Sequence, residues 1–118
     1  MRVDHYLKAD GSDPFQDGLD AMRDFKAIAK IERCVDRMRL GNLGDHRSCG
    51  EGVCEARIDY GPGYRVYYSQ MGKDFLLLFC SGDKTSQGQD IERAKEYRKD
   101  FLQRIRKEIR NGQTHTKP

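Results

Sequence analysis

A three-residue turn, Gly61-Pro62-Gly63, separates two segments with strand character and constrains the fold more than any other feature of the sequence. Apolar and polar residues alternate along residues 53–60, which is the period-two pattern of a half-buried strand. Glycines adopt the positive φ angles of tight turns, so the chain is expected to reverse its direction here. Residues 64–70 then return as the partner strand, and the two segments predict an antiparallel hairpin.

Two further segments extend this hairpin into a sheet. A turn at residues 71–74 leads to the longest apolar run of the chain, from Phe75 to Cys80. Such a run is typical of a strand that is covered on both sides. A weaker pattern from Arg2 to Leu7 is consistent with a short opening strand. The sequence therefore predicts a small, mainly antiparallel sheet.

The first helical region extends from about Asp13 to Leu40, as two helices or as one bent helix. Asp13 is suited to the N-cap and Pro14 to the first turn, where its missing N–H costs nothing. Gly41 follows as the glycine that ends the helix in a left-handed conformation. The apolar stripe at helical spacing comprises Phe15, Leu19, Met22, Phe25, Ile28, Ile31, Val35 and Met38.

A second helical region begins at Ser86, because the segment from Ser86 to Gln89 matches the S-x-x-Q capping box. Its apolar stripe comprises Ile91, Ala94, Tyr97, Phe101, Ile105 and Ile109. The resulting order, β-α-(α)-β-β-β-α, predicts an α+β fold in which a small twisted sheet has its helices on one face. Residues 1–111 are expected to form a single domain, and residues 112–118 a flexible polar tail.

Composition and charge exclude several classes of protein. The chain has 118 residues, 36% of them hydrophobic and 35% charged, and its net charge of +3 does not by itself indicate nucleic-acid binding. Neither a signal peptide nor an apolar run long enough to span a membrane is present, so we expect a cytoplasmic protein without a membrane partner. The four cysteines are expected to be reduced thiols, because no export signal is found, and their spacing does not match a zinc site.

Basic residues converge on the polar face of the predicted hairpin. Arg57 and Arg65 lie on its two strands together with Tyr67, and Lys84 follows the apolar strand. Guanidinium groups on neighbouring strands bind phosphate oxygens and remain charged at any working pH. Such an array can stabilise a pentacovalent phosphate under attack by a ribose 2′-OH, without a metal.

The same residues also have a simpler interpretation as ordinary surface ion pairs. If the tyrosines on either side of the turn pair with each other, Arg65 lies opposite Asp59, and Arg57 lies opposite Tyr67. Arg65 would then pair with Asp59, and Arg57 with Glu55 or with an acid of a helix. Spacing alone does not choose between this interpretation and phosphate chemistry.

Four motifs in a fixed order narrow the choice. They are Gly41-Asn-Leu-Gly-Asp45, then Gly52-Val-Cys-Glu-Ala-Arg57-Ile, then Gly61-Pro-Gly-Tyr-Arg-Val-Tyr-Tyr68, and finally Ser81-Gly-Asp-Lys-Thr-Ser-Gln87 with Asp90-Ile91. This series resembles the RelE/ParE toxin superfamily, and most closely its HigB-like group of addiction module killer proteins. The resemblance extends from about Leu40 to Tyr97 and implies the fold of that family, a small twisted sheet flanked by helices.

The resemblance implies the toxin of a bacterial type II toxin–antitoxin pair. Such toxins are neutralised by a cognate antitoxin, often a helix-turn-helix DNA-binding protein in this branch, and many cleave messenger RNA on the ribosome. Carried over by motif, Arg57 and Arg65 would clamp and stabilise the scissile phosphate, and Lys84 would supply charge or a proton at the leaving 5′-oxygen. Tyr67 would orient the nucleotide or stack on a base. Neither a metal nor another cofactor is implied.

Two alternatives share this fold. ParE-like relatives act on DNA gyrase, and an inactive homologue would only bind its antitoxin and co-repress their operon. The residues before Arg57 also depart from RelE, which has lysines where this chain has Val53 and Glu55. An acid at Glu55 is expected to repel RNA, and the resemblance identifies no general base.

Overall fold

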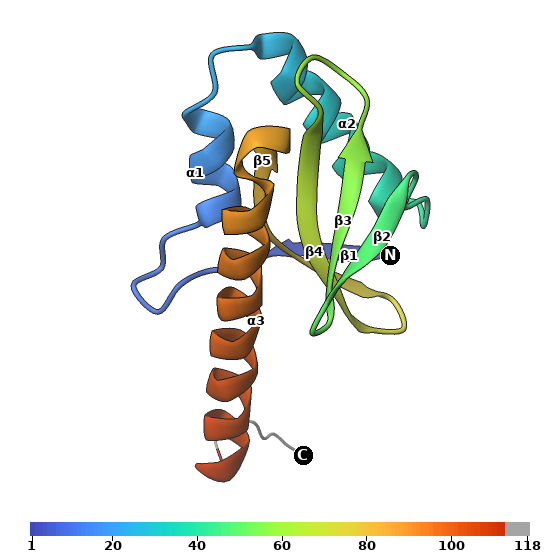
Figure 1. The fold of residues 1–118 in the computed structure, drawn as a ribbon. Helices are drawn as coiled ribbons and strands as arrows, with labels where there is room; N and C mark the ends of the chain where they lie inside the picture. The colour runs from blue at the N-terminus through green and yellow to red at the C-terminus, as the bar shows by residue number, and fades with distance from the viewer. Residues whose placement is uncertain (113–118) are drawn as a thin grey trace.

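Five strands form one sheet in the computed structural model, which describes residues 1–112 (Figure 1). The order across the sheet is β1-β5-β4-β3-β2, with β1 parallel to β5 and the other neighbours antiparallel. The strands are β1 (Arg2–His5), β2 (His46–Gly50), β3 (Val53–Ile58), β4 (Tyr64–Gly72) and β5 (Phe75–Asp83). The predicted α+β class with a mainly antiparallel sheet is confirmed, whereas β2 was not predicted.

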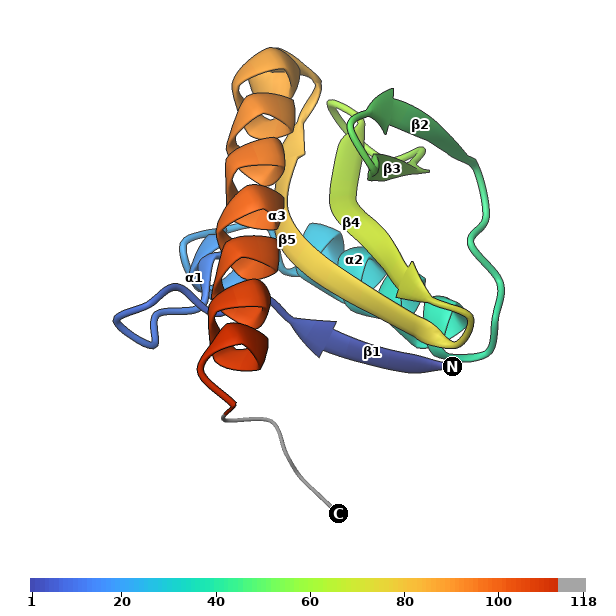
Figure 2. The same ribbon diagram turned by 90° about the horizontal axis from the view of Figure 1, so that it is seen from below.

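Three helices of the described residues cover both faces of this sheet. The helices α1 (Pro14–Asp20) and α2 (Phe25–Arg39) lie on one face, and α3 (Gln87–Arg110) lies on the other (Figure 2). The expectation of helices on a single face is therefore wrong, because apolar side chains on both faces of the sheet need cover. The tail predicted from residue 112 onward lies outside the described residues, apart from Gly112 itself.

Alternate residues of β5 contribute to two separate cores. Leu76 and Leu78 pack with the buried side chains of α1 and α2. Leu77 and Phe79 face the opposite way and pack with Ala94 of α3. All four leucine and phenylalanine side chains are at most 2% exposed, which confirms that the apolar run forms a strand covered on both sides.

Local capping fixes the first two helices largely as predicted. Asp13 caps α1, since its carboxylate accepts a hydrogen bond from the backbone N–H of Gln16 at 3.0 Å. The region forms two separate helices rather than one bent helix, and Asp24 caps the second one, α2. Phe25 does not belong to the apolar stripe, because it starts α2 with 82% of its surface exposed. Gly41 follows the helix with the expected positive φ of 86°.

The hairpin of β3 and β4 differs in register from the predicted one. Ile58 pairs with Tyr64, so the loop comprises residues 59–63 rather than three residues. Tyr60 leaves the ladder because its hydroxyl donates to the carboxylate of Asp24 at 3.1 Å and its ring stacks on Tyr64, with centroids 6.4 Å apart. A contact with the distant cap of α2 thus accompanies the longer loop.

The turn into α3 also differs from its prediction. A short 3₁₀ turn (Lys84–Ser86) precedes the helix, and Ser86 occupies the N-cap position without a capping hydrogen bond from its side chain. Its hydroxyl instead donates to the carboxylate of Asp90 at 2.6 Å, so the expected capping box is not formed. None of the helices within residues 1–112 has both the length and the apolar composition needed to cross a membrane.

Candidate functional site

Three of the predicted site residues lie at one end of the sheet. Arg57 of β3 lies directly opposite Arg65 of β4, and Arg65 in turn lies opposite Gly82 of β5. Lys84 follows Gly82 by two residues, in the 3₁₀ turn. The register thus places three basic residues on neighbouring segments of the chain.

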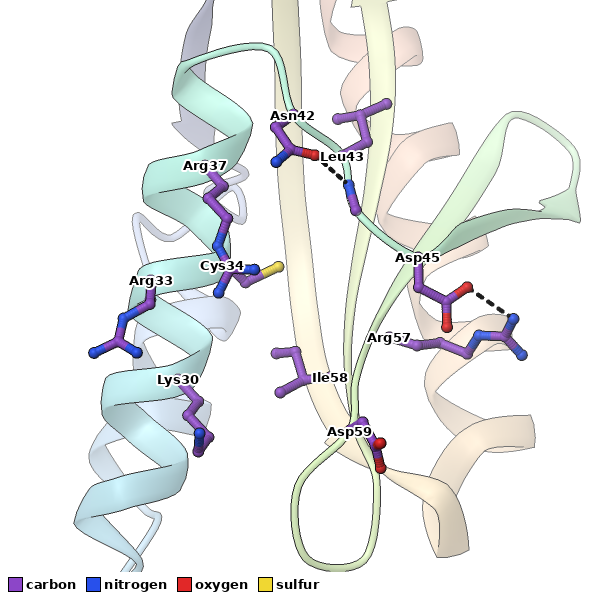
Figure 3. A pocket seen from close by; sticks show the side chains of 11 residues that line it. Lys30, Arg33, Cys34, Arg37, Asn42, Leu43, Asp45, Arg57, Ile58 and Asp59 are labelled. Carbon is purple, nitrogen blue, oxygen red and sulfur yellow. Dashed lines mark hydrogen bonds and ion pairs between the residues drawn. The ribbon is translucent and has the colours of Figure 1, made fainter.

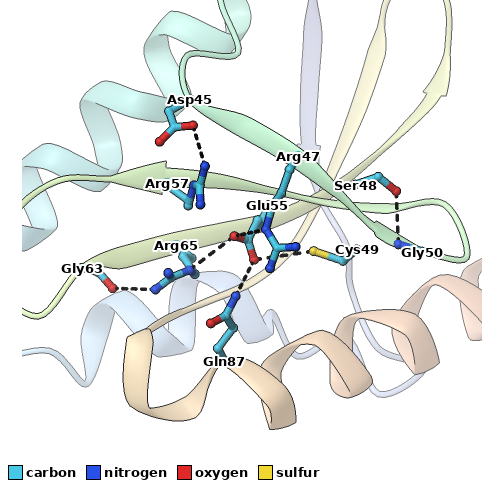
Figure 4. Close-up of polar contacts among 10 residues, drawn as sticks. All are labelled: Asp45, Arg47, Ser48, Cys49, Gly50, Glu55, Arg57, Gly63, Arg65 and Gln87. Atoms are coloured by element: carbon cyan, nitrogen blue, oxygen red, sulfur yellow. Dashed lines mark hydrogen bonds and ion pairs between the residues drawn. The ribbon is translucent and has the colours of Figure 1, made fainter.

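Each of the two opposed arginines has its own carboxylate, which offsets the cost of placing like charges across a strand pair. Nη2 of Arg57 lies 3.0 Å from Oδ1 of Asp45, and Nε of Arg65 lies 3.4 Å from Oε2 of Glu55 (Figure 4). The partners expected from the sequence, Asp59 for Arg65 and Glu55 or a helix acid for Arg57, are therefore wrong. The observed register and the loop before β2 determine the actual partners.

Glu55 is fully buried, although the alternating pattern predicted an exposed side chain. Its carboxylate accepts hydrogen bonds from Arg47 Nε at 3.0 Å, from Gln87 Nε2 at 3.1 Å and from Arg65, and the thiol of Cys49 lies 3.6 Å away (Figure 4). Burial raises the pKa of the Cys49 thiol to about 11, as does the charge of Glu55, so the thiol stays protonated and remains a donor. These donors compensate the charge of Glu55 inside the protein, so the acid is not the exposed one that the sequence predicted.

Arg65 is held through two of its three nitrogens. Nε contacts Glu55, and Nη1 donates to the carbonyl oxygen of Gly63 at 3.2 Å. Its side chain is only 12% exposed, and Nη2 makes no hydrogen bond with any residue from 1 to 112. The guanidinium therefore has a fixed position and a free donor, which is suited to binding an oxygen of a phosphate group.

Arg57 and Arg65 line one shallow hollow around the end of the hairpin, together with Tyr64. The side chain of Arg57 is 42% exposed, so its guanidinium is accessible from solvent. Lys84 is exposed as well and forms no ion pair within the described part of the chain. Among residues 1–112, no group of three or more His, Cys, Asp or Glu side chains could hold a metal ion.

Tyr67 does not lie with these exposed cations. Its side chain is fully buried between the sheet and α3, in the core cluster that contains Ala94. Burial also raises the pKa of its hydroxyl, which has no hydrogen-bond partner among the described residues. Its ring is thus inaccessible to a base in this conformation.

Sequence reasoning missed the residues that position Arg65. Glu55 was read as an exposed acid, and Arg47 and Gln87 were not singled out. Arg47 could have been predicted as a partner of Glu55 only if β2 had been predicted, because the two residues lie directly opposite each other on β2 and β3. Because the pattern of β2 does not resemble a strand, no local signal pointed to this contact.

One comparison with known proteins establishes a family for the chain. A protein of Haemophilus influenzae, described as an uncharacterized protein, is 41% identical over 81 residues, which cover 69% of this chain and 82% of the relative. The chain belongs to the same family as this protein. No family model matches the sequence. The relative shows that the two proteins share a family, but its description gives no activity.

Proposed function

We propose that the protein is the toxin of a bacterial type II toxin–antitoxin pair and cleaves messenger RNA on the ribosome. The observation that carries the proposal is the position of Arg65, whose guanidinium is anchored by Glu55 and Gly63 and lines a hollow with Arg57. Lys84 supplies a third cation at the same end of the sheet. The motif resemblance described above assigns these same three residues to phosphate chemistry.

In the proposed reaction, the ribose 2′-oxygen attacks the adjacent phosphorus and the bond from phosphorus to the 5′-oxygen breaks. The 2′-OH gives its proton to a water molecule, and the leaving 5′-oxygen takes one from Lys84 or from water, so the products are a 2′,3′-cyclic phosphate and a 5′-hydroxyl. Arg57 and Arg65 stabilise the charge that develops on the non-bridging oxygens. Lys84 provides a proton or a positive charge at the 5′-oxygen.

Substitution of Arg65 tests this proposal. Arg65→Ala is expected to lose about 3 kcal/mol of transition-state stabilisation, comparable to the loss of an oxyanion-hole donor, and so to reduce RNA cleavage roughly 100-fold. Arg65→Lys is expected to restore little activity, because a single ammonium cannot keep the contacts with Glu55 and Gly63 and also present a donor in the fixed direction of Nη2. The measurements are growth arrest and mapping of RNA cuts after induction.

Folding must be measured in the same experiment, because Arg65 is not the exposed ion pair that the sequence suggested. Its partner Glu55 is fully buried, so removal of Arg65 costs stability as well as activity. Thermal melts identify variants that are still folded at the assay temperature. A folded Arg65→Ala protein that cleaves RNA at the normal rate would contradict the proposal. Growth arrest without RNA cleavage, accompanied by blocked DNA supercoiling, would indicate a gyrase inhibitor instead.

A further inference from the structure

A second basic surface lies between α2 and β3, where a cleft of about 240 Å³ opens to solvent (Figure 3). Lys30, Arg33 and Arg37 line it from α2, and Cys34 and Ile58 lie on its inner side. The three basic residues of α2 are three and four positions apart, so their side chains are neighbours on one face of the helix. This face is separate from the network around Glu55, which lies on the α3 side of the sheet.

The positive charges of this cleft have few acidic partners. Arg33 and Arg37 form no ion pair within residues 1–112, and the ammonium of Lys30 lies over the ring of Tyr60, 5.2 Å from its centroid. The same helix does pair a cation elsewhere, since Nη1 of Arg39 lies 2.7 Å from Oδ1 of Asp36. The acids that line the cleft are Asp45 and Asp59, of which Asp45 already binds Arg57. An excess of positive charge therefore remains.

This cleft adjoins the hollow of Arg57 and Arg65 at the end of β3. The two share Asp45, Arg57, Ile58 and Asp59 in their linings. A third hollow shares Lys30 and Arg33 with the cleft and reaches Lys26 and Tyr60. We call these three adjoining hollows together the α2 groove. It leads from the proposed reaction site along α2 to the beginning of that helix.

Tyr60 lines the α2 groove near the start of α2, and its ring stacks on Tyr64, which lines the hollow of Arg57 and Arg65. Tyr60 and Tyr64 are half-buried and stack with an interplanar angle of 22°. Phe25 is 82% exposed at the start of α2, next to Asp24, which accepts the hydroxyl hydrogen bond of Tyr60. Proteins bind single-stranded nucleic acids through two such features. Cations along a groove contact the phosphates, and aromatic rings beside the groove contact the bases.

We propose that the α2 groove binds the phosphodiester backbone of a single-stranded nucleic acid and guides it to Arg57 and Arg65. The prediction that this nucleic acid is RNA rests on the proposed function, whereas the prediction that the groove binds a phosphodiester backbone does not. Lys30, Arg33 and Arg37 contact successive phosphates, and the exposed aromatic rings contact bases near the start of α2. The nucleic acid then passes the end of β3, at Ile58, to reach the hollow at the end of the hairpin.

The test measures the binding of a fluorescent ten-nucleotide 2′-O-methyl RNA, whose blocked 2′-oxygen prevents cleavage. The double variant Arg33→Ala/Arg37→Ala is expected to weaken binding roughly tenfold and to reduce the slope of log K against log salt by about 1.4, from the loss of two phosphate contacts. The control is Lys107→Ala/Arg110→Ala, which removes the same charge from the exposed end of α3 and should change the affinity less than about twofold. Both pairs are exposed on helices, where alanine is well tolerated.

Each outcome decides the proposal. Unchanged binding by the α2 variant, or an equal loss in both double variants, would overturn it. A loss that affects a deca-glutamate peptide but not the oligonucleotide would also overturn it and assign the groove to an acidic protein segment. If the α2 variant loses as much affinity for a DNA ten-mer as for the RNA analogue, the groove binds the backbone of either nucleic acid. If only the affinity for the RNA analogue falls, the groove is an RNA site. If the parent protein cleaves no RNA while the groove variant loses binding, the proposed function fails and the groove stands.

Discussion

At the scale of single residues, Glu55 combines complete burial with a negative charge. Burial alone would raise the pKa of its carboxyl group, but hydrogen bonds from Arg47 and Gln87 and the charges of Arg47 and Arg65 lower it further than burial raises it. The pKa therefore lies below its ordinary value of 4.5. A carboxylate held in this way connects β2, β3, β4 and the start of α3.

Removing this charge is expected to destabilise the fold. Glu55→Gln keeps the volume of the side chain but leaves Arg65 without its anion in a nearly buried position, so we expect a loss of about 3 kcal/mol in the free energy of unfolding. Asp59→Asn makes the same chemical change at an exposed position and should stay within about 0.5 kcal/mol of the parent. Urea denaturation of the three proteins measures both values.

The pH dependence of this loss has a definite sign. Because the folded pKa of Glu55 is depressed, its contribution is fully present above the pKa of the unfolded chain and is lost as the pH falls through the folded value. The difference between the parent and Glu55→Gln should therefore be constant near neutral pH and shrink below about pH 4.5. A difference that grows as the pH falls would show that Glu55 is not a stabilising anion.

The same residues show how far side-chain partners can be predicted. The sequence indicated that Arg57 and Arg65 lie on neighbouring strands, because alternation and the turn define a hairpin. It did not indicate Asp45 or Glu55 as their partners. Those contacts depend on the register of β3 and β4 and on β2, a strand without a recognisable pattern.

At the scale of elements, the junction of β5 and α3 has very little space. A Cβ atom at Gly82 would overlap with the carboxylate of Asp90 and would lie 2.8 Å from the hydroxyl of Ser86. Asp90 is 3% exposed and accepts the hydrogen bond of Ser86 at 2.6 Å. The absence of a side chain at Gly82 therefore lets the first turn of α3 approach the strand that ends at the proposed site.

Two glycine substitutions test this close approach. Gly82→Ala is expected to destabilise the protein by about 2 kcal/mol, because the added methyl group must displace a buried carboxylate. Gly88→Ala adds the same group in α3 where no atom lies within 4 Å, and it should stabilise the helix by about 0.5 kcal/mol. Thermal melts compare the two. Equal melting temperatures would show that the junction relaxes at little cost.

Elements with strong local signals were predictable, and those defined by their neighbours were not. Asp13 and Pro14 define the start of α1, and the apolar run defines β5, since capping and burial act within a few residues. Residues 46–50 carry no such signal, because β2 is exposed along most of its length. The strand exists because a tight turn at Glu51, with a positive φ of 52°, lets it pair with β3.

At the scale of the whole molecule, helices on both faces leave one end of the sheet uncovered. The order of the elements was enough to predict the class of the fold. It was not enough to predict that helices lie on both faces, because the alternating pattern of β3 and β4 indicated a polar second face, whereas that face is largely apolar. Tyr67 is the clearest case, since it was expected on a polar surface and lies in the second core. Arg57 and Lys84 are exposed at this end, and Arg65 lies beside them with 12% of its side chain exposed.

If the protein is the proposed toxin, its exposed basic residues need a partner that covers them. We expect the gene beside this one to encode a small DNA-binding protein, whose acidic or amphipathic segment covers Arg57, Arg65 and Lys84 and so blocks the substrate. The two proteins should co-purify after co-expression, and Lys84→Glu should weaken the complex, because it places a negative charge against an acidic segment. A Lys107→Glu variant, altered on the exposed end of α3, serves as the control and should bind normally. A complex that forms equally well with both variants would place the partner elsewhere, and the absence of any such neighbour or complex would contradict the toxin proposal.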